Sequence, residues 1–228
     1  SVSSSTNEDT SVTIALDGSD EDGDNLTYAV VTNPSNGTAS VSGATVIYQP
    51  SLNFNGSDSF TYKANDGTSD SNISTVIITV NAVNDVPVSE SESLTTDEDT
   101  DGSISLTASD VDGDNLSYSI IVQPSNGSVS LSGNVATFSP STNFNGSDLF
   151  SFITTDGIGF SNEATISITI NSVNDAPVAN DVTASTTENR SIQLSITLDA
   201  TDVDGDDLTY SIVSDVSNGT TSITGSTL

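Results

Sequence analysis

An internal repeat of 90 residues constrains this 228-residue chain more than any other feature of its sequence. When the sequence is shifted by 90 positions, 41 of the 80 residues from Glu8 to Pro87 are identical to their counterparts, and no gap is needed. A third copy starts at Glu188 and stops about half-way, at Leu228. Since internal repeats decide the architecture of a chain, we expect tandem domains at residues 1–86, 87–176 and 177–228, the last of them incomplete.

Within each repeat the short-range pattern is that of β-strands. Large apolar residues recur at every second position over 12–16, 26–30 and 76–80, as in strands with one buried face. Gly, Asn and Pro separate these segments, for example over 33–37, and supply the φ angles that tight turns require. About seven short strands in about 90 residues predict an all-β chain with an antiparallel β-sandwich in each repeat, arranged end to end.

The charge of the chain excludes several classes of partner and reaction. The formal net charge is −30, and Lys63 and Arg190 are the only basic residues. Nucleic acids and anionic membrane surfaces require many Lys and Arg, and no apolar run approaches the roughly 18 residues of a membrane span. The chain has no His and no Cys, which removes the usual general base, the thiolate nucleophile and zinc fingers. We therefore expect no nucleic-acid binding, no membrane insertion and no enzyme activity.

Acidic runs recur in register near the start of each repeat, at 20–24, 110–114 and 202–206. Carboxylates two residues apart in a curled, Gly-containing loop can point to one side. Their mutual repulsion reverses in the presence of a hard cation, and Ca²⁺ takes six to eight oxygen ligands at about 2.3–2.6 Å. A single run is equally well explained as a solvated turn. Three copies in register favour Ca²⁺ binding.

Several motifs, taken together, resemble a known family over nearly the whole chain. They are an early Glu, then D-x-D-G-D-N-L-x-Y, N-F-N-G-S-D, a D-G after a strand, and a final N-D-x-P. This combination resembles cadherin-like domains and, more closely, the tandem Ig-like repeats of large bacterial surface adhesins of the RTX type. The resemblance implies Ca²⁺ ions at the junctions between consecutive repeats, held by the base of one repeat, the linker and the top of the next.

The resemblance also implies which residues are metal ligands. The first junction would use Glu8, Asp58, Asn84, Asp85, Asp110, Asp112 and Asp156, with Asp114 as a further candidate. The second would use Glu98, Asp148, Asn174, Asp175, Asp202 and Asp204. The top of the first repeat would offer Asp20, Asp22, Asp24 and Asp66, which lack linker partners and so bind weakly or use another chain. Because Ala82 and Val86 replace polar linker residues of cadherins, we expect one or two ions per junction.

The leading functional hypothesis is therefore mechanical. Non-catalytic extender repeats of a secreted or cell-surface bacterial adhesin would be stiffened by Ca²⁺ and would support adhesion or biofilm formation. One alternative is a filament or surface-layer subunit that self-associates by strand complementation of the incomplete third repeat. Another is a polysaccharide-binding module, to which the absence of Trp and the aromatic content of 5% give little support. Because Ser1 opens neither a signal peptide nor a Met-initiated chain, we expect an internal or processed piece.

Overall fold

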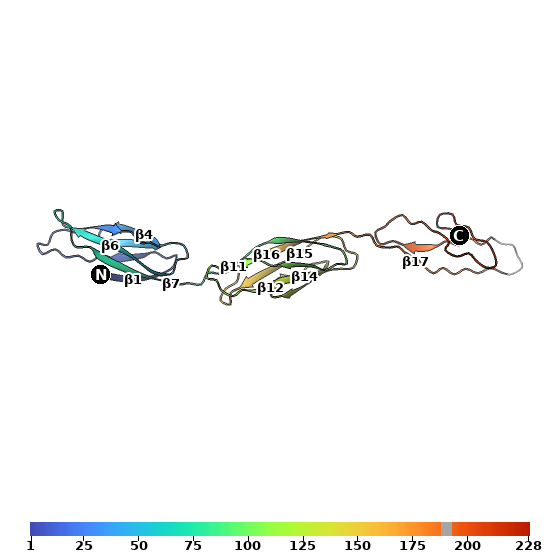
Figure 1. Cartoon of the computed structure of the whole chain (residues 1–228), viewed down its shortest axis with the longest axis horizontal. Helices are drawn as coiled ribbons and strands as arrows, with labels where there is room; N and C mark the ends of the chain where they lie inside the picture. The colour runs from blue at the N-terminus through green and yellow to red at the C-terminus, as the bar shows by residue number, and fades with distance from the viewer. Residues whose placement is uncertain (188–192) are drawn as a thin grey trace. The chain divides into compact units, whose positions relative to one another are not determined.

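The structure is a computed structural model that describes residues 1–187 and 193–228, so the predicted start of the third copy at Glu188 lies outside it. All regular elements in the described ranges are β-strands (Figure 1), which confirms the predicted all-β class. Those ranges contain no helix with the length and apolarity needed to cross a membrane. The described residues form two compact units. One comprises 1–88, 108–116 and 154–161, and the other comprises 89–107, 117–153 and 162–228.

The first repeat is a sandwich of two sheets. The larger sheet has the order β1 (Val2–Asn7), β7 (Ser74–Asn81), β6 (Gly56–Asn65) and β3 (Thr27–Thr32). The smaller sheet has the order β2 (Val12–Ala15), β5 (Thr45–Pro50) and β4 (Gly37–Ser42). Most neighbouring strands are antiparallel. β1 and β7 instead run parallel, in register from Val2 opposite Val76 to Asn7 opposite Asn81.

Alternation along these strands builds the core between the two sheets. Val46 and Tyr48 of β5 are fully buried, and Phe60, Val76 and Ile78 from the other sheet pack with them. Residues two apart in a strand share a face, so every second residue of a strand faces the core, and the residues between them, Ile47 and Ile77 included, face solvent. Burying the larger of these side chains contributes about 1.5–3 kcal/mol each.

The second repeat repeats this plan. One sheet has the order β12 (Ser117–Val122), β15 (Gly146–Thr155), β16 (Ala164–Asn171) and β9 (Glu92–Asp97). The other has the order β10 (Gly102–Ser105), β14 (Val135–Pro140) and β13 (Gly127–Ser132). Two further strands are very short, β8 (Val88–Ser89) and β11 (Ala108–Ser109). Leu106, Phe138, Phe150, Phe152 and Ile166 form the centre of the core.

The third repeat has much less regular structure in its described part. β17 (Val178–Asn180) pairs antiparallel with β18 (Asp199–Thr201). None of the described residues after 177 is buried. The described part of the third repeat therefore shows a strand pair but no closed core.

Candidate metal centres

Each acidic run folds into a loop that is ordered by its own first carboxylate. Asp110 Oδ1 accepts a hydrogen bond from Asp114 N at 3.2 Å. Asp20 and Asp202 each accept two such bonds, from the residues two and four positions later, at 2.9–3.1 Å and 3.0–3.2 Å. Gly113 has a φ of 78° and allows the chain to turn back on itself. One oxygen of each leading Asp thus orders the loop, and the other carboxylate oxygens remain available to a ligand.

In the second repeat this loop gathers three carboxylates. Asp110, Asp112 and Asp114 each place one oxygen within 4.8 Å of the other two. Two oxygens on the same Ca²⁺ lie at most about 5 Å apart, because each Ca–O distance is about 2.3–2.6 Å. The spacing therefore fits a shared ion, whereas carboxylates without an ion would repel one another.

The linker between the first two repeats is hydrogen-bonded to this loop within the first compact unit. Asp85 N donates to Asp112 Oδ2 at 2.8 Å, and Asn84 Nδ2 donates to Asp156 Oδ2 at 2.8 Å. The second oxygen of Asp156 accepts bonds from the N–H groups of Ile158 and Gly159. These backbone donors and the Asn84 amide hold the pKa of the Asp156 carboxyl below its ordinary value.

We call the group formed by Glu8, Asp9, Asn84, Asp85, Asp110, Asp112, Asp114 and Asp156 the first linker site. Three of its buried carboxylate oxygens have no hydrogen-bond partner among the described residues: Glu8 Oε2, Asp85 Oδ2 and Asp110 Oδ2. Glu8 is only 4% exposed, and its other oxygen accepts a bond from Val83 N at 2.5 Å. A buried unpaired carboxylate oxygen is costly, so three in one site fit a cation that would ligate them.

The charges within the first linker site destabilise the ionised form of Asp85. Burial raises the pKa of the Asp85 carboxyl, and repulsion from Asp112, Asp9, Glu8 and Asp110 raises it further. A cation placed among these groups would remove the repulsion and replace the lost hydration. The electrostatics and the unpaired oxygens thus indicate the same kind of ligand.

The second linker site lies within the second compact unit and comprises Glu98, Asp99, Asn174, Asp175, Asp202, Asp204 and Asp206. It repeats the first in outline, because Asp175 N donates to Asp204 Oδ2 and Val173 N donates to Glu98 Oε1, both at 2.6 Å. Asp175 Oδ2 is again buried without a partner. Burial raises the pKa of Asp175, with repulsion from Asp204 as the next cause.

Two residues of these sites, Asp9 and Asp99, were missed by the sequence analysis. Both have a positive φ, 56° and 55°. Their side chains accept hydrogen bonds from Asn53 N and Asn143 N at 2.9 and 3.0 Å. Each lies close enough to the linker carboxylate to raise its pKa. The repeated Glu-Asp-Thr sequence at Glu8 and Glu98 was the available signal.

Asp58, which the resemblance assigned to the metal, lies in a different environment. Its carboxylate is 6% exposed and accepts bonds from Ser35 N, Asn36 N, Ser59 N and the Tyr48 hydroxyl, at 2.8–3.0 Å. Burial raises its pKa, but these donors together outweigh burial and lower it.

Asp148 has the same position in the second repeat, where Ser125 N and Asn126 N donate to it at 3.0 and 2.6 Å. Neither Asp58 nor Asp148 is joined by a hydrogen bond to the other proposed ligands within the described residues. In both repeats the carboxylate instead anchors the turn that precedes β4 or β13.

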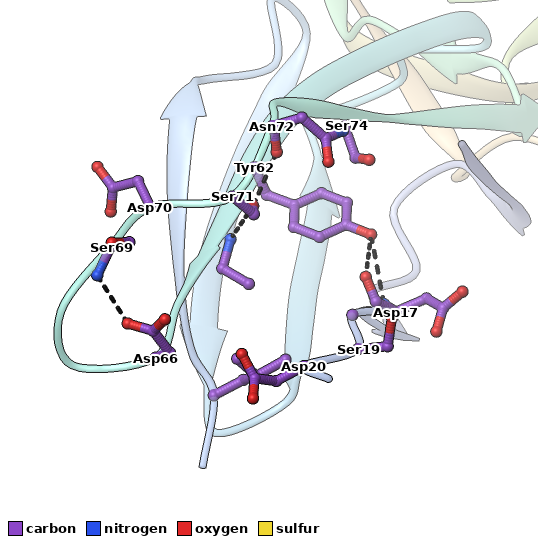
Figure 2. A pocket seen from close by; sticks show the side chains of 13 residues that line it. Asp17, Ser19, Asp20, Tyr62, Asp66, Ser69, Asp70, Ser71, Asn72 and Ser74 are labelled. Carbon is purple, nitrogen blue, oxygen red and sulfur yellow. Dashed lines mark hydrogen bonds between the residues drawn. The ribbon is translucent and has the colours of Figure 1, made fainter. Parts of the chain in front are cut away.

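The top of the first repeat brings Asp20 and Asp66 to opposite sides of one groove (Figure 2). Asp66 Oδ1 accepts bonds from Thr68 N and Ser69 N at 2.6 and 2.7 Å, which lower its pKa. No carboxylate oxygen of this described region is buried without a partner. The region therefore has the loop geometry of the linker sites without their unpaired buried oxygens.

Comparison with known proteins identifies a family for the chain and solved structures with a similar fold. A family model described as a bacterial Ig domain matches residues 1–79, 84–169 and 174–228. The extracellular cadherin repeats EC21–23 of human CDH23 are 17% identical, with a TM-score of 0.59 over 99% of this chain and 90% of that one. Protocadherin gamma B2 domains 1–5 are 18% identical, with a TM-score of 0.52 over 89% of this chain and 45% of that one. These two likenesses concern the fold alone.

An endo-fucoidan hydrolase of glycoside hydrolase family 107 also matches, at 22% identity and a TM-score of 0.34 over 75% of this chain. This chain spans only 27% of the length of that hydrolase. The comparison with curated proteins finds no match.

Proposed function

This chain belongs to the bacterial Ig domain family, and from that premise we propose that its repeats are structural units of a secreted or cell-surface bacterial adhesin whose linkers bind Ca²⁺. Tandem repeats of this kind fit a structural, extracellular role, and such domains are typically non-catalytic. One observation carries the metal proposal: the three buried oxygens of Glu8, Asp85 and Asp110 that lack a partner. Adhesion or biofilm formation would then be the role of the whole parent protein.

In the first linker site, the proposed ligands come from separate segments of the chain. Glu8 follows β1, Asp85 lies in the linker, and Asp110 and Asp112 follow β11. An ion bound by all of them would tie the linker to the loops on both sides of it. The Asp85 N–H bond to Asp112 already orients this linker, so ion binding would require little reorganisation. Asp58 and Asp148 are not included, because their hydrogen bonds within the described residues join them to the turns at 35–36 and 125–126 and not to the other proposed ligands.

Ca²⁺ is proposed over Mg²⁺ because the donor set is large and flexible. Four or more carboxylates and an amide suit a coordination number of six to eight, whereas Mg²⁺ requires a compact octahedron and retains several waters. The second linker site offers an analogous donor set through Glu98, Asp175, Asp202 and Asp204.

The test is a calorimetric Ca²⁺ titration of the full chain and of the Asp85→Asn variant. We expect the variant to lose one site while the second linker site is retained. Asp101→Asn is the matched control, because Asp101 is exposed and belongs to neither site. Unaltered stoichiometry and affinity in Asp85→Asn would overturn the proposal. Small-angle scattering with and without chelator tests the mechanical part, for which unchanged dimensions would be the contrary result.

A further inference from the structure

Four residues other than Gly have a left-handed backbone within residues 1–187 and 193–228, and all four lie in the linker sites or in the turns beside them. They are Asp9 and Asn53 in the first repeat, with φ angles of 56° and 53°, and Asp99 and Asn143 in the second, both at 55°. Left-handed φ angles are unfavourable for residues with a Cβ, and they cluster at functional sites. Their concentration here points to a functional reason.

Within each repeat the two left-handed residues are hydrogen-bonded to each other, although they lie 44 residues apart in the sequence. Asn53 N donates to Asp9 Oδ1 at 2.9 Å, and Asn143 N donates to Asp99 Oδ1 at 3.0 Å. No other hydrogen bond among the described residues reaches the side chain of Asp9. Its second carboxylate oxygen is therefore available to a cation.

The turn that carries Asn53 is fixed to the core of its repeat. Phe54 packs against the buried cluster of the first sandwich, and its N–H donates to Ser51 O at 3.1 Å. Ser51 N donates in turn to Asn36 O at 2.9 Å. Phe144 packs and donates in the same way in the second repeat. The N-F-N-G motif thus holds one backbone N–H at a fixed place beside the acidic residues.

Asp9 lies next to a buried ligand of the first linker site. Its neighbour Glu8 is 4% exposed, and Glu8 Oε2 has no hydrogen-bond partner among the described residues. Burial raises the pKa of Asp85, and Asp9 is among the charges that raise it further. The turn at Asp9 is itself tied down, because Thr6 Oγ1 donates to Thr10 O at 2.8 Å. Asp9 is therefore held close to both the buried Glu8 and the linker carboxylate.

We propose that Asn53 is a positioning residue for the first linker site, and that it makes Asp9 a ligand of the bound cation. The Asn53 N–H holds one oxygen of Asp9 and directs the other to the ion shared with Glu8. This inference rests on the Ca²⁺ site proposed above. A hydrogen bond to a carboxylate is stronger than one between neutral groups, and a ligand fixed before binding costs less to immobilise. Asn143 has the same role for Asp99 in the second linker site.

The test is a calorimetric Ca²⁺ titration of the full chain carrying Asp175→Asn, which removes the second linker site from the titration. We expect Asn53→Val to weaken the first site about tenfold, because a β-branched residue resists a positive φ and would withdraw the N–H. Asn53→Gly keeps the N–H and adopts this φ freely, so it should retain the affinity of the parent. Leu52→Val, at an exposed position of the same turn without a positive φ, is the matched control and should bind as the parent does.

A double-mutant cycle separates positioning from a general loss of structure. Asp9→Asn keeps an oxygen for the Asn53 N–H and should also weaken Ca²⁺ binding about tenfold, and Asn53→Val should then cause no further loss. Additive losses, or full affinity in Asn53→Val, would overturn the positioning role and leave the metal proposal intact. No Ca²⁺ binding by the Asp175→Asn chain itself would overturn both.

Circular dichroism in chelator checks that each variant is folded. Should Asn53→Val fail to fold, Asn53→Ala takes its place in the same cycle, with a smaller loss of affinity expected because Ala resists a positive φ less than Val does. Equal affinity of Asn53→Ala and Asn53→Gly would then be the contrary result.

Discussion

Glu8→Gln gives the sharpest test of the first linker site, because its effect on stability should change sign with Ca²⁺. The substitution keeps the side-chain shape and an oxygen to accept the Val83 N–H bond. It removes the charge of a carboxylate that is 4% exposed and has one oxygen without a partner. In chelator we therefore expect the variant to melt at the same temperature as the parent or higher.

The magnitude in Ca²⁺ follows from linkage. Extracellular modules bind Ca²⁺ with a Kd of about 10⁻⁴–10⁻³ M, so about 10 mM Ca²⁺ stabilises a one-site repeat by about 1.4–2.7 kcal/mol. A tenfold loss of affinity on removing one charged ligand would remove about 1–1.4 kcal/mol of this. For a repeat of this size the difference in Tm is roughly 4–11 °C.

The assay is differential scanning calorimetry of the full chain in chelator and in Ca²⁺. Glu98→Gln is the matched variant in the second linker site, and Asp101→Asn controls for the loss of one surface charge. The reasoning is refuted if Ca²⁺ raises the Tm of Glu8→Gln as much as that of the parent. It is also refuted if Asp101→Asn lowers the Ca²⁺-induced rise equally.

Three further predictions concern the surroundings of the site. Tyr48→Phe removes the hydroxyl donor to Asp58 and should lower the free energy of unfolding of the first repeat by about 1.5 kcal/mol in denaturant titrations, with Ca²⁺ affinity unchanged. Gly159→Ala would place a Cβ 2.4 Å from Val86 Cγ1, so it should displace the linker, cost about 1–3 kcal/mol and weaken Ca²⁺ binding in calorimetry. The pKa of Asp85 is raised in the folded chain. The stability that its protonated carboxyl contributes without metal is therefore fully present at a pH below the ordinary Asp pKa of about 3.9, and it is lost as the pH rises through the raised pKa. Melting curves in chelator between pH 7 and pH 4 should show this pH-dependent stability in the parent and not in Asp85→Asn. Ca²⁺ affinity should fall as the pH is lowered over the same range.

The fold could be predicted because two features of the sequence are periodic: the 90-residue repeat, and the apolar residues at every second position of the strands. Alternation places Phe60 and Tyr62, and ninety residues later Phe150 and Phe152, on the buried faces of β6 and β15. Family membership confirms the resemblance drawn from the motifs. The third repeat was less predictable, since its sequence has the same acidic motif but its described residues form only β17 and β18.

The residues of the proposed metal sites were harder to predict from the sequence. The resemblance assigned Asp58 to the metal, and that assignment stays a prediction. In the structure its oxygens accept hydrogen bonds from the N–H groups of Ser35 and Asn36, and such backbone donors leave no signature in residue identity. Asp9 was overlooked because adjacent residues in a strand face opposite sides. Its positive φ breaks that rule by turning the chain just after β1.

The parallel pairing of β1 with β7 determines how a single repeat responds to force. The first and last strands of the repeat lie side by side in six paired positions and run in the same direction. Tension applied through the two ends of the repeat therefore pulls β1 and β7 past each other and loads their hydrogen bonds in shear. In a sheared ladder the bonds share the load and must break together, whereas a hairpin pulled open at one end breaks them one by one. β9 and β16 are paired in the same way, so each complete sandwich is built to resist stretching along its strands.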